Sequence, residues 1–246
     1  RNLEDWERSL KERLFIAAMS DHVDMSAIQA DFDRIALFSA DGWNHNSHYH
    51  NFLLKHVPVQ CKNALEIGCG TGAFARLLAK RSDSVLALDL SPQMIHLARE
   101  RSKQYPNIDF QVTDALSWEF PIEQFDCIIS IATLHHLPME IMLSKMKAAL
   151  KINGTLLILD LFKERFSDMY ADLLAIPVNI VLKSLKTGRM KETLEVRKAW
   201  AEHGQRDSYM TLPHIRRICA IDLPGARVRR HLLWRYSIVW KKTPLT

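Results

Sequence analysis

The glycine-rich segment 64–72, ALEIGCGTG, is the part of the chain whose residue types and spacing point most directly to chemistry. Gly68, Gly70 and Gly72 follow a short apolar run and precede the helical pattern FARLLAK. Because glycine has no side chain, the backbone N–H groups of such a turn can approach a ligand closely, and the N-terminus of the next helix favours an anionic group. The segment therefore predicts a site for a nucleotide-like cofactor.

Three acidic residues accompany this loop. Glu66 precedes the first glycine by two residues, where the dinucleotide-binding pattern usually has an apolar residue. Asp89 ends the run VLALD, about 20 residues after Gly68, and can accept hydrogen bonds from both hydroxyls of a ribose. Asp114 ends the run QVTD, from which a carboxylate can accept a hydrogen bond from an exocyclic amine such as that of adenine. One such acid alone could be a loop cap, but three in register favour a binding role.

Two adjacent histidines follow the apolar run FDCIISIATL. Histidine is suited to remove a proton near neutral pH, so His135 and His136 are the candidate catalytic residues. We expect one of them to face the pocket, where His135 would also contact the substrate, and the other to cap the next helix. A purely structural role for both is the alternative.

The polar and aromatic segment WNHNSHYH offers three histidines, His45, His48 and His50. Their spacing matches no standard zinc pattern, and no carboxylate or cysteine completes a set, so no metal is predicted. We expect instead a helix that closes over the cofactor, or else simply an exposed loop. The candidate cofactor contacts in this segment are Trp43, Asn46 and Tyr49. Further along the chain, the candidate substrate contacts are Trp200, His203, Asp207 and Tyr209.

The elements that must position these residues follow from hydrophobic patterning. Between residues 63 and 161, short β-branched or leucine-rich runs alternate with helical stretches, which is typical of a doubly wound parallel α/β sheet. Two closely spaced alternating runs near the end predict an antiparallel hairpin. We expect N-terminal helices over 1–58, a cofactor-binding core over 59–161, a helical cap insertion over 162–213, and a final helix and hairpin over 214–246 that complete the core.

Composition narrows the class of protein. The 246 residues are 48% hydrophobic and 25% charged, as in a globular domain, and no apolar run is long enough for a membrane span. The four scattered cysteines indicate free thiols, and the charged first residues do not resemble a signal peptide. We therefore expect a soluble, cytoplasmic protein. The net charge of +5 permits a nucleic-acid partner without implying one.

The glycine segment, the strand-ending Asp89, the Asp114–Ala115 pair, the run FDCIISIATLHHLP and the final hairpin together resemble class I S-adenosylmethionine-dependent methyltransferases. The likeness is greatest to the small-molecule branch, which includes ubiquinone and menaquinone biosynthesis methyltransferases. It implies a Rossmann-like, seven-stranded, mostly parallel sheet with an antiparallel last strand, and S-adenosylmethionine as the cofactor. By position, the implied cofactor contacts are Gly68, Cys69, Gly70, Asp89, Leu90, Met94, Asp114, Ala115, Leu116 and Ile131.

The leading hypothesis is therefore methyl transfer to a small, hydrophobic or aromatic molecule. A nucleic-acid (RNA) methyltransferase is less favoured, because the segment after the fourth strand reads SIATLHHLP and not the N-P-P-Y type of motif. An NAD-dependent oxidoreductase fits the GxGxxA spacing of the loop but leaves Glu66 and Asp114 without a role. A non-catalytic cofactor-binding protein is the third alternative, since the motifs concern cofactor binding. The sequence fixes neither the acceptor atom nor the oligomeric state.

Overall fold

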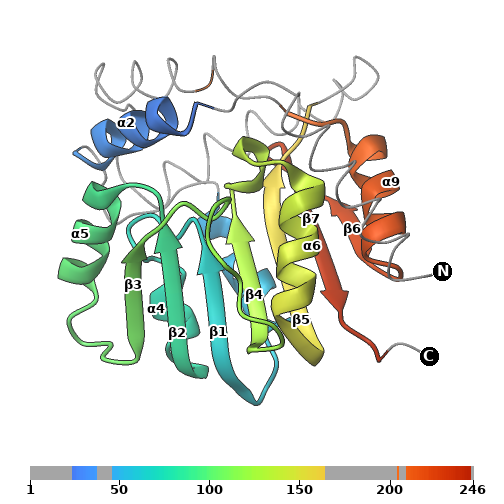
Figure 1. Ribbon diagram of the computed structural model, residues 1–246, viewed down its shortest axis with the longest axis horizontal. Coiled ribbons are helices and arrows are strands. Elements are labelled where there is room, and N and C mark those ends of the chain that lie inside the picture. Colours follow the sequence, from blue (N-terminus) through green and yellow to red (C-terminus); the bar gives the residue numbers. More distant parts are fainter. Residues whose placement is uncertain (1–23, 38–45, 164–203, 205–208, 245–246) are drawn as a thin grey trace.

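The structure is a computed structural model that describes residues 24–37, 46–163, 204 and 209–244. At its centre lies a seven-stranded sheet in the order β3-β2-β1-β4-β5-β7-β6 (Figure 1). The first five strands pair in parallel, whereas β7 runs antiparallel to both β5 and β6. The strands are β1 Cys61–Ile67, β2 Ser82–Asp89, β3 Ile108–Val112, β4 Phe125–Ile131, β5 Leu150–Leu161, β6 Arg227–Arg230 and β7 Arg235–Lys241.

This topology confirms the predicted sheet, including its antiparallel last strand and the C-terminal hairpin. The order runs outward from β1 to β3 on one side and from β4 to β5 on the other, so the direction of winding reverses between β1 and β4. Doubly wound sheets bind their ligands beyond the carboxyl ends of the strands at such a reversal. The glycine segment lies at this position, directly after β1.

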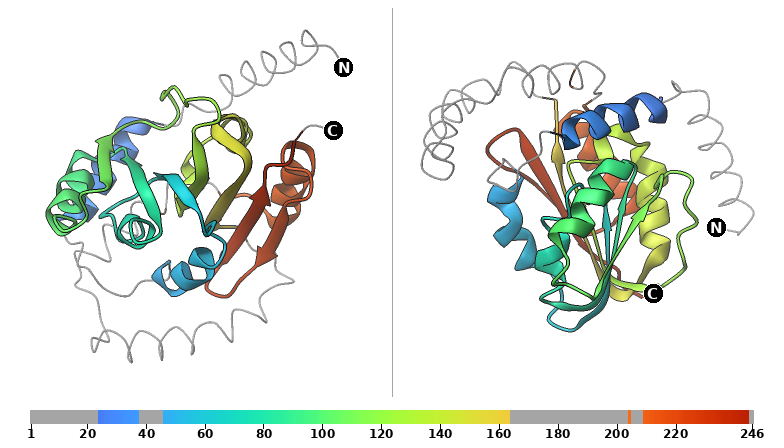
Figure 2. Two further views of the ribbon diagram at one scale, coloured as in Figure 1. Left: turned by 90° about the horizontal axis from the view of Figure 1, so that it is seen from below. Right: turned by 90° about the vertical axis from the view of Figure 1, so that its left-hand side faces the viewer.

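Helices cover both faces of the sheet, and each face has its own core. On one face, α6 and α9 bury residues such as Met142 and Ile218 against apolar residues of β1, β4, β5 and β7. On the other face, α3, α4 and α5 bury residues such as Leu53, Leu78 and Ile95 against the same central strands. Figure 2 shows these two layers edge-on. The helices are α3 His50–Leu54, α4 Ala75–Leu78, α5 Pro92–Arg101, α6 Met139–Ala149 and α9 Leu212–Asp222, with short 3-10 helices η1 Ser47–Tyr49 and η2 Leu134–His136.

Helix α2, Met25–Ala36, lies across the carboxyl end of the sheet beside α5 (Figure 1). It begins at an N-cap, Asp24, whose Oδ1 accepts hydrogen bonds from Ser26 N and Ala27 N, both at 3.1 Å. Its apolar side packs Ile35 and Ala36 against Met94 of α5. Helix α2 lies within the range 1–58 for which N-terminal helices are predicted, and on the side of the sheet where ligands are expected.

Several predicted features fall outside the described residues or are shorter than expected. The helix predicted near FARLLAK is only the four residues of α4. The predicted first helix and most of the proposed cap over 162–213 lie outside the described residues. Along the described part of the chain, no helix has the length and apolar character needed to cross a membrane.

Candidate cofactor and acceptor site

The loop between β1 and α4 has a backbone that favours glycine. Gly68, Gly70 and Gly72 have φ values of 73°, 52° and 74°, in the left-handed region. Gly68 N donates a hydrogen bond of 2.8 Å to Leu88 O, which joins the loop to β2. A Cβ at Gly68 would lie 1.9 Å from Thr133 Oγ1, whereas a Cβ at Gly70 would meet no described heavy atom within 4 Å. The loop is therefore closed against neighbouring side chains at Gly68 and open at Gly70, where a ligand can lie against the backbone.

Asp89, at the end of β2, lies against the open part of this loop. Its Oδ2 accepts a hydrogen bond from Gly70 N at 2.7 Å, and its Oδ1 accepts one from Ser91 N at 2.9 Å. Burial raises the pKa of Asp89 to about 6, against the effect of these backbone hydrogen bonds, which lower it. Backbone amides thus hold the carboxylate in place, and an ionised oxygen has further lone pairs for the ribose hydroxyls of a cofactor.

Glu66 is buried beneath the loop, with 2% of its surface exposed. It accepts a hydrogen bond from the backbone of Ala75, while its Oε2 has no hydrogen-bond partner among the described residues. Burial, followed by the nearby negative charge of Asp89, raises its pKa well above the usual range. An unsatisfied buried oxygen beside an open glycine loop fits a site that a polar ligand completes.

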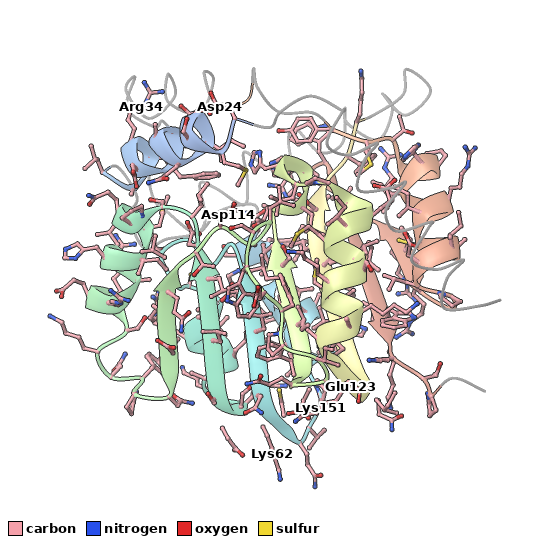
Figure 3. All side chains as sticks on the ribbon, in the orientation of Figure 1. Asp24, Arg34, Lys62, Asp114, Glu123 and Lys151 are labelled. Carbon is pink, nitrogen blue, oxygen red and sulfur yellow. The ribbon has the colours of Figure 1, made fainter. Side chains whose placement is uncertain are left out.

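Asp114 follows β3 at the same edge of the sheet. Its Oδ1 accepts a hydrogen bond of 2.8 Å from Leu116 N, which makes a local turn. Ala115, within this turn, is buried. In Figure 3 the labelled Asp114 lies at the carboxyl edge, whereas Lys62 and Lys151 lie at the opposite edge. The structure thus brings Asp114 to the edge that carries the glycine loop and Asp89.

The remaining cofactor contacts implied by the sequence surround this edge. Cys69, Met94 and Ile131 are buried, and Leu90 is half-buried. Burial raises the pKa of the Cys69 thiol well above its usual range, so the thiol is uncharged at neutral pH. An uncharged, buried thiol is suited to packing. The contacts of all four residues with a cofactor stay predictions.

The end of β4 is tied closely to the glycine loop. Ala132 has a φ of 51°, which is strained for a residue with a side chain, and its N donates to Leu159 O at 2.8 Å. Thr133 follows, and its Oγ1 donates a hydrogen bond of 3.1 Å to Ile131 O. This is the hydroxyl that a Cβ at Gly68 would meet. The short helix η2, which carries both candidate histidines, therefore begins against the first glycine of the loop.

The two histidines have different surroundings. His135 Nδ1 lies 2.6 Å from Asp160 Oδ1, and His135 N donates to Asp160 Oδ2 at 2.9 Å. His136 N donates to Thr133 O at 3.1 Å within η2, and its ring meets the edge of Phe32 of α2, with 5.6 Å between centroids. The imidazole rings of His135 and His136 are themselves 3.8 Å apart, centroid to centroid. His135 therefore has a carboxylate partner, whereas His136 links η2 to α2.

Two of the predicted substrate contacts, His135 and Tyr209, are among the described residues. Their rings lie 5.2 Å apart, centroid to centroid. Arg235 is also close, since the charges of Asp160 and Tyr209 interact with the charge of its guanidinium group. The side chain of Arg235 donates from Nε to Asn46 Oδ1 at 2.9 Å and from an Nη to Leu233 O at 3.0 Å. Arg235 was not among the residues predicted for the site.

The two described residues of the segment expected to close over the cofactor contact the C-terminal hairpin. Asn46 binds Arg235 at the start of β7, and Tyr49 Oη donates to Leu232 O at 2.6 Å. The Tyr49 ring also lies 5.1 Å from that of His231, between centroids. Their side chains thus join the N-terminal segment to the sheet, and their role as cofactor contacts stays a prediction. Trp43, Trp200, His203 and Asp207 lie outside the described residues.

The described histidines of the same segment, His48 and His50, pack against aromatic rings. The His50 ring packs 5.0 Å from that of Phe74, and burial lowers the pKa of His50 to about 4. His48 stacks at its edge against Tyr49. Within the described part of the chain, no group of three or more His, Cys, Asp or Glu side chains could hold a metal ion.

Two further features of this edge were not predicted from the sequence, one a residue and the other a hydrogen bond. Asp160 is one, although it is the penultimate residue of an apolar strand, much as Asp89 is the last residue of β2, and a similar signal would have identified it. The other is the hydrogen bond of 2.5 Å from Ser91 Oγ to Asp33 Oδ1, which ties α2 to the N-terminus of α5. The helical pattern of α2 gives no sign of this partner.

Comparison with known proteins points to methyltransferases. Residues 64–154 match the family model described as "Methyltransferase domain". An uncharacterized methyltransferase of Mycobacterium tuberculosis is 29% identical over 211 residues, which are 81% of this chain and 96% of that protein. A ubiquinone biosynthesis O-methyltransferase of Xylella fastidiosa is 29% identical over 131 residues, 48% of this chain and 53% of that protein. The crystal structure of the N-methyltransferase NodS from Bradyrhizobium japonicum, in complex with S-adenosylhomocysteine, has a TM-score of 0.54 at 18% identity and covers 88% of this chain and 98% of that one.

The sheet, the glycine loop and these relatives together support a class I S-adenosylmethionine-dependent methyltransferase. S-adenosylmethionine is its cofactor, and the residues fit that group. Among the described residues, Gly70 leaves open space beside the loop, Asp89 presents a held carboxylate, and Glu66 has an oxygen without a hydrogen-bond partner.

Proposed function

We propose that this methyltransferase acts on a small, hydrophobic or aromatic molecule whose acceptor atom lies beside η2. The observation that carries the proposal is the cluster of rings next to the glycine loop. His135 contacts Tyr209, and His136 contacts both His135 and Phe32 of α2. Flat, largely apolar side chains of this kind suit a flat or apolar acceptor.

The relatives support a small acceptor without defining it. One similar protein is named as a ubiquinone biosynthesis O-methyltransferase, so its acceptor is a small-molecule hydroxyl. The match spans about half of each chain, so the acceptor of this chain is a proposal of its own.

The contribution of the protein to such a reaction is mainly alignment. The bound cofactor supplies an electrophilic methyl group on a sulfonium. The glycine loop and Asp89 would hold the ribose side of the cofactor, and the end of β4 would place the acceptor in line with the methyl group. Exclusion of water by α2, which lies over this edge, would favour transfer to the acceptor.

The experiment is an acceptor screen with S-adenosylmethionine radiolabelled on its methyl group. The screen includes quinols, phenols, fatty acids and small amines, with total RNA as the contrasting substrate. We expect label in a small-molecule product, and much less of it when Asp89→Ala replaces the wild type. Label in RNA alone would establish the nucleic-acid alternative, and cofactor binding without any transfer would establish a non-catalytic protein.

A further inference from the structure

Asp160 and His135 form a buried pair at the carboxyl ends of β5 and β4. Their side chains are 1% and 7% exposed, and His135 Nδ1 lies 2.6 Å from Asp160 Oδ1. The carboxylate is held on both oxygens by backbone amides as well, since His135 N donates to Oδ2 at 2.9 Å and Leu161 N donates to Oδ1 at 2.8 Å. The carboxylate therefore has a fixed orientation before any substrate binds.

This contact determines which ring nitrogen of His135 carries the proton. A carboxylate only accepts hydrogen bonds, so Nδ1 must be the donor to Asp160, and Nε2 is then the nitrogen that can take up a proton. A nearby carboxylate also stabilises the imidazolium that forms when Nε2 is protonated. Arg235 lies close enough for its charge to interact with that of Asp160.

The pair of His135 and Asp160 lies close to the glycine loop. Thr133, two residues before His135, is the side chain that closes against Gly68. Asp160 lies beside β4 and pairs with Tyr236 of β7 in the sheet register. A proton acceptor in η2 is thus linked through a single turn to the first glycine of the loop that binds the methyl donor.

We propose that Asp160 is a positioning residue that holds His135 as the general base for a hydroxyl-bearing acceptor, so that the chain is an O-methyltransferase. This rests on the proposed function and adds the acceptor group to it. The O–H bond breaks and its proton goes to His135 Nε2, while the oxygen lone pair forms the new O–CH3 bond. The S–CH3 bond breaks with its electron pair left on sulfur, so the positive charge moves from the sulfonium to the imidazolium.

The class of acceptor follows from when its proton must leave. An uncharged amine attacks with its own lone pair and loses its proton afterwards, and a thiol ionises readily near neutral pH. An alcohol or phenol is a weak nucleophile until its proton is removed, so it gains most from an adjacent base. A buried histidine held by a carboxylate therefore suits a hydroxyl best.

The first test measures the proton position directly. Protein labelled with nitrogen-15 in histidine and loaded with S-adenosylhomocysteine is examined by long-range proton–nitrogen NMR, and the His135 signals are assigned by their loss in His135→Gln. We expect a protonated Nδ1 and an unprotonated Nε2 at neutral pH, and a switch to protonated Nε2 in Asp160→Asn, whose amide would donate to Nδ1. A protonated Nε2 in the wild type would overturn the proposal.

The second test compares two phenols that differ mainly in acidity. At mildly alkaline pH, 4-nitrophenol is largely ionised and needs no base, whereas 4-methylphenol is not ionised and needs one. We expect Asp160→Asn to slow methylation of 4-methylphenol by roughly 100-fold and that of 4-nitrophenol only slightly. The double variant with His135→Gln should be no slower than His135→Gln alone, because the two residues act as one unit.

The control is Asp126→Asn. Asp126 also accepts hydrogen bonds from two backbone amides, Lys62 N and Asn63 N, but at the opposite edge of the sheet. It should lose stability while keeping the His135 signals and both methylation rates. Equal slowing of both phenols by Asp160→Asn would make Asp160 merely structural. Transfer to amines or thiols but to neither phenol would overturn the acceptor class, and transfer to no acceptor at all would contradict the proposed function instead.

Discussion

Asp89 is the residue on which we expect cofactor binding to depend most. Its carboxylate is oriented by Gly70 N and Ser91 N, and its burial raises its pKa to about 6. The hydrogen bonds and the raised pKa both follow from the position of this carboxylate, which lies partly out of water against the glycine loop. Its protonation should therefore be visible in the affinity for the cofactor.

We expect the affinity for S-adenosylhomocysteine to fall as the pH is lowered through about 6. Above this pH the Asp89 carboxylate is ionised and accepts hydrogen bonds from the ribose, whereas below it the proton occupies one acceptor site. Calorimetric titrations across this range measure the effect. In Asp89→Asn, affinity should be weaker and its dependence on pH near 6 should disappear. The same dependence in both proteins would assign it to another group.

The glycines of the loop should respond differently to alanine. Gly68→Ala places a methyl group 1.9 Å from Thr133 Oγ1, so we expect a marked loss of folding stability. Gly70→Ala meets no described atom and carries only the left-handed backbone strain of about 1–2 kcal/mol. Its methyl group would instead occupy the space beside the loop, so the folded protein should bind the cofactor poorly. Thermal unfolding and titration of each variant distinguish the two, and full affinity in Gly70→Ala would place the cofactor elsewhere.

At the scale of elements, α2 and the N-terminus of α5 form one unit over the carboxyl edge. Ser91 links them, because its Oγ accepts from Met94 N at 3.0 Å as the N-cap of α5 and donates to Asp33 of α2 at 2.5 Å. The apolar contact of Ile35 and Met94 lies beside this link. Helix α2 is thus attached to the element that follows Asp89.

We expect Ser91→Ala to reduce the free energy of unfolding by about 1 kcal/mol, the usual cost of an N-cap, because Met94 N loses its acceptor. Loss of the Asp33 contact should also make α2 exchange its amide hydrogens faster. Urea unfolding and hydrogen exchange measure the two effects. Asp33→Ala, which removes the acceptor of Ser91 Oγ and leaves the cap in place, should speed exchange in α2 with a smaller loss of stability. Unchanged exchange in both variants would show that apolar packing alone holds α2.

The elements themselves were largely predictable. The alternating runs of 63–161 and the closely spaced runs of the hairpin indicated the sheet and its direction changes, because strand burial imposes a period on the sequence. The shortness of α4 was not predictable, since FARLLAK has a helical pattern well beyond Ala75–Leu78. The described part of the segment WNHNSHYH contains η1, but the sequence did not indicate its contacts with the C-terminal hairpin.

For the molecule as a whole, two carboxyl groups at the glycine loop make the free energy of unfolding depend on pH. Burial raises the pKa of Glu66 well above the usual range, and it raises that of Asp89 to about 6. For a group whose pKa is higher in the folded protein, the stabilisation is complete below its ordinary pKa and is lost as the pH rises through the folded value. These two groups therefore favour the folded state in mild acid and oppose it at neutral pH.

We expect Glu66→Gln to unfold at a higher denaturant concentration than the wild type at about pH 8, because it removes a buried charge near Asp89. At about pH 5 the two proteins should differ less. Urea unfolding of the cofactor-free protein at both pH values measures the difference, with Glu123→Gln, a half-exposed carboxylate at the opposite edge, as the control. A difference that does not depend on pH would mean that folding does not raise the pKa of Glu66.

The site was predictable where it is local and unpredictable where it is long-range. The glycine loop, Asp89 and Asp114 follow from residue type and position at strand ends, and the structure brings them to one edge. The contacts of Asn46 and Tyr49 with the hairpin join residues 189 and 183 positions apart. Pairing of His135 with Asp160 likewise depends on the order of strands in the sheet. No periodicity in a single sequence encodes such partners.

The most direct test of the account is calorimetric binding of S-adenosylmethionine, S-adenosylhomocysteine and NAD to the whole chain, with Asp89→Ala and Asp126→Asn as the variants. The account predicts binding of the two sulfur compounds and not of NAD. Asp89→Ala should weaken their binding by about 1.5–3 kcal/mol, the value of charge-assisted hydrogen bonds. Asp126→Asn, altered at the far edge of the sheet, should bind as the wild type does. Binding of NAD alone, or sulfur compounds bound equally well by Asp89→Ala, would contradict it.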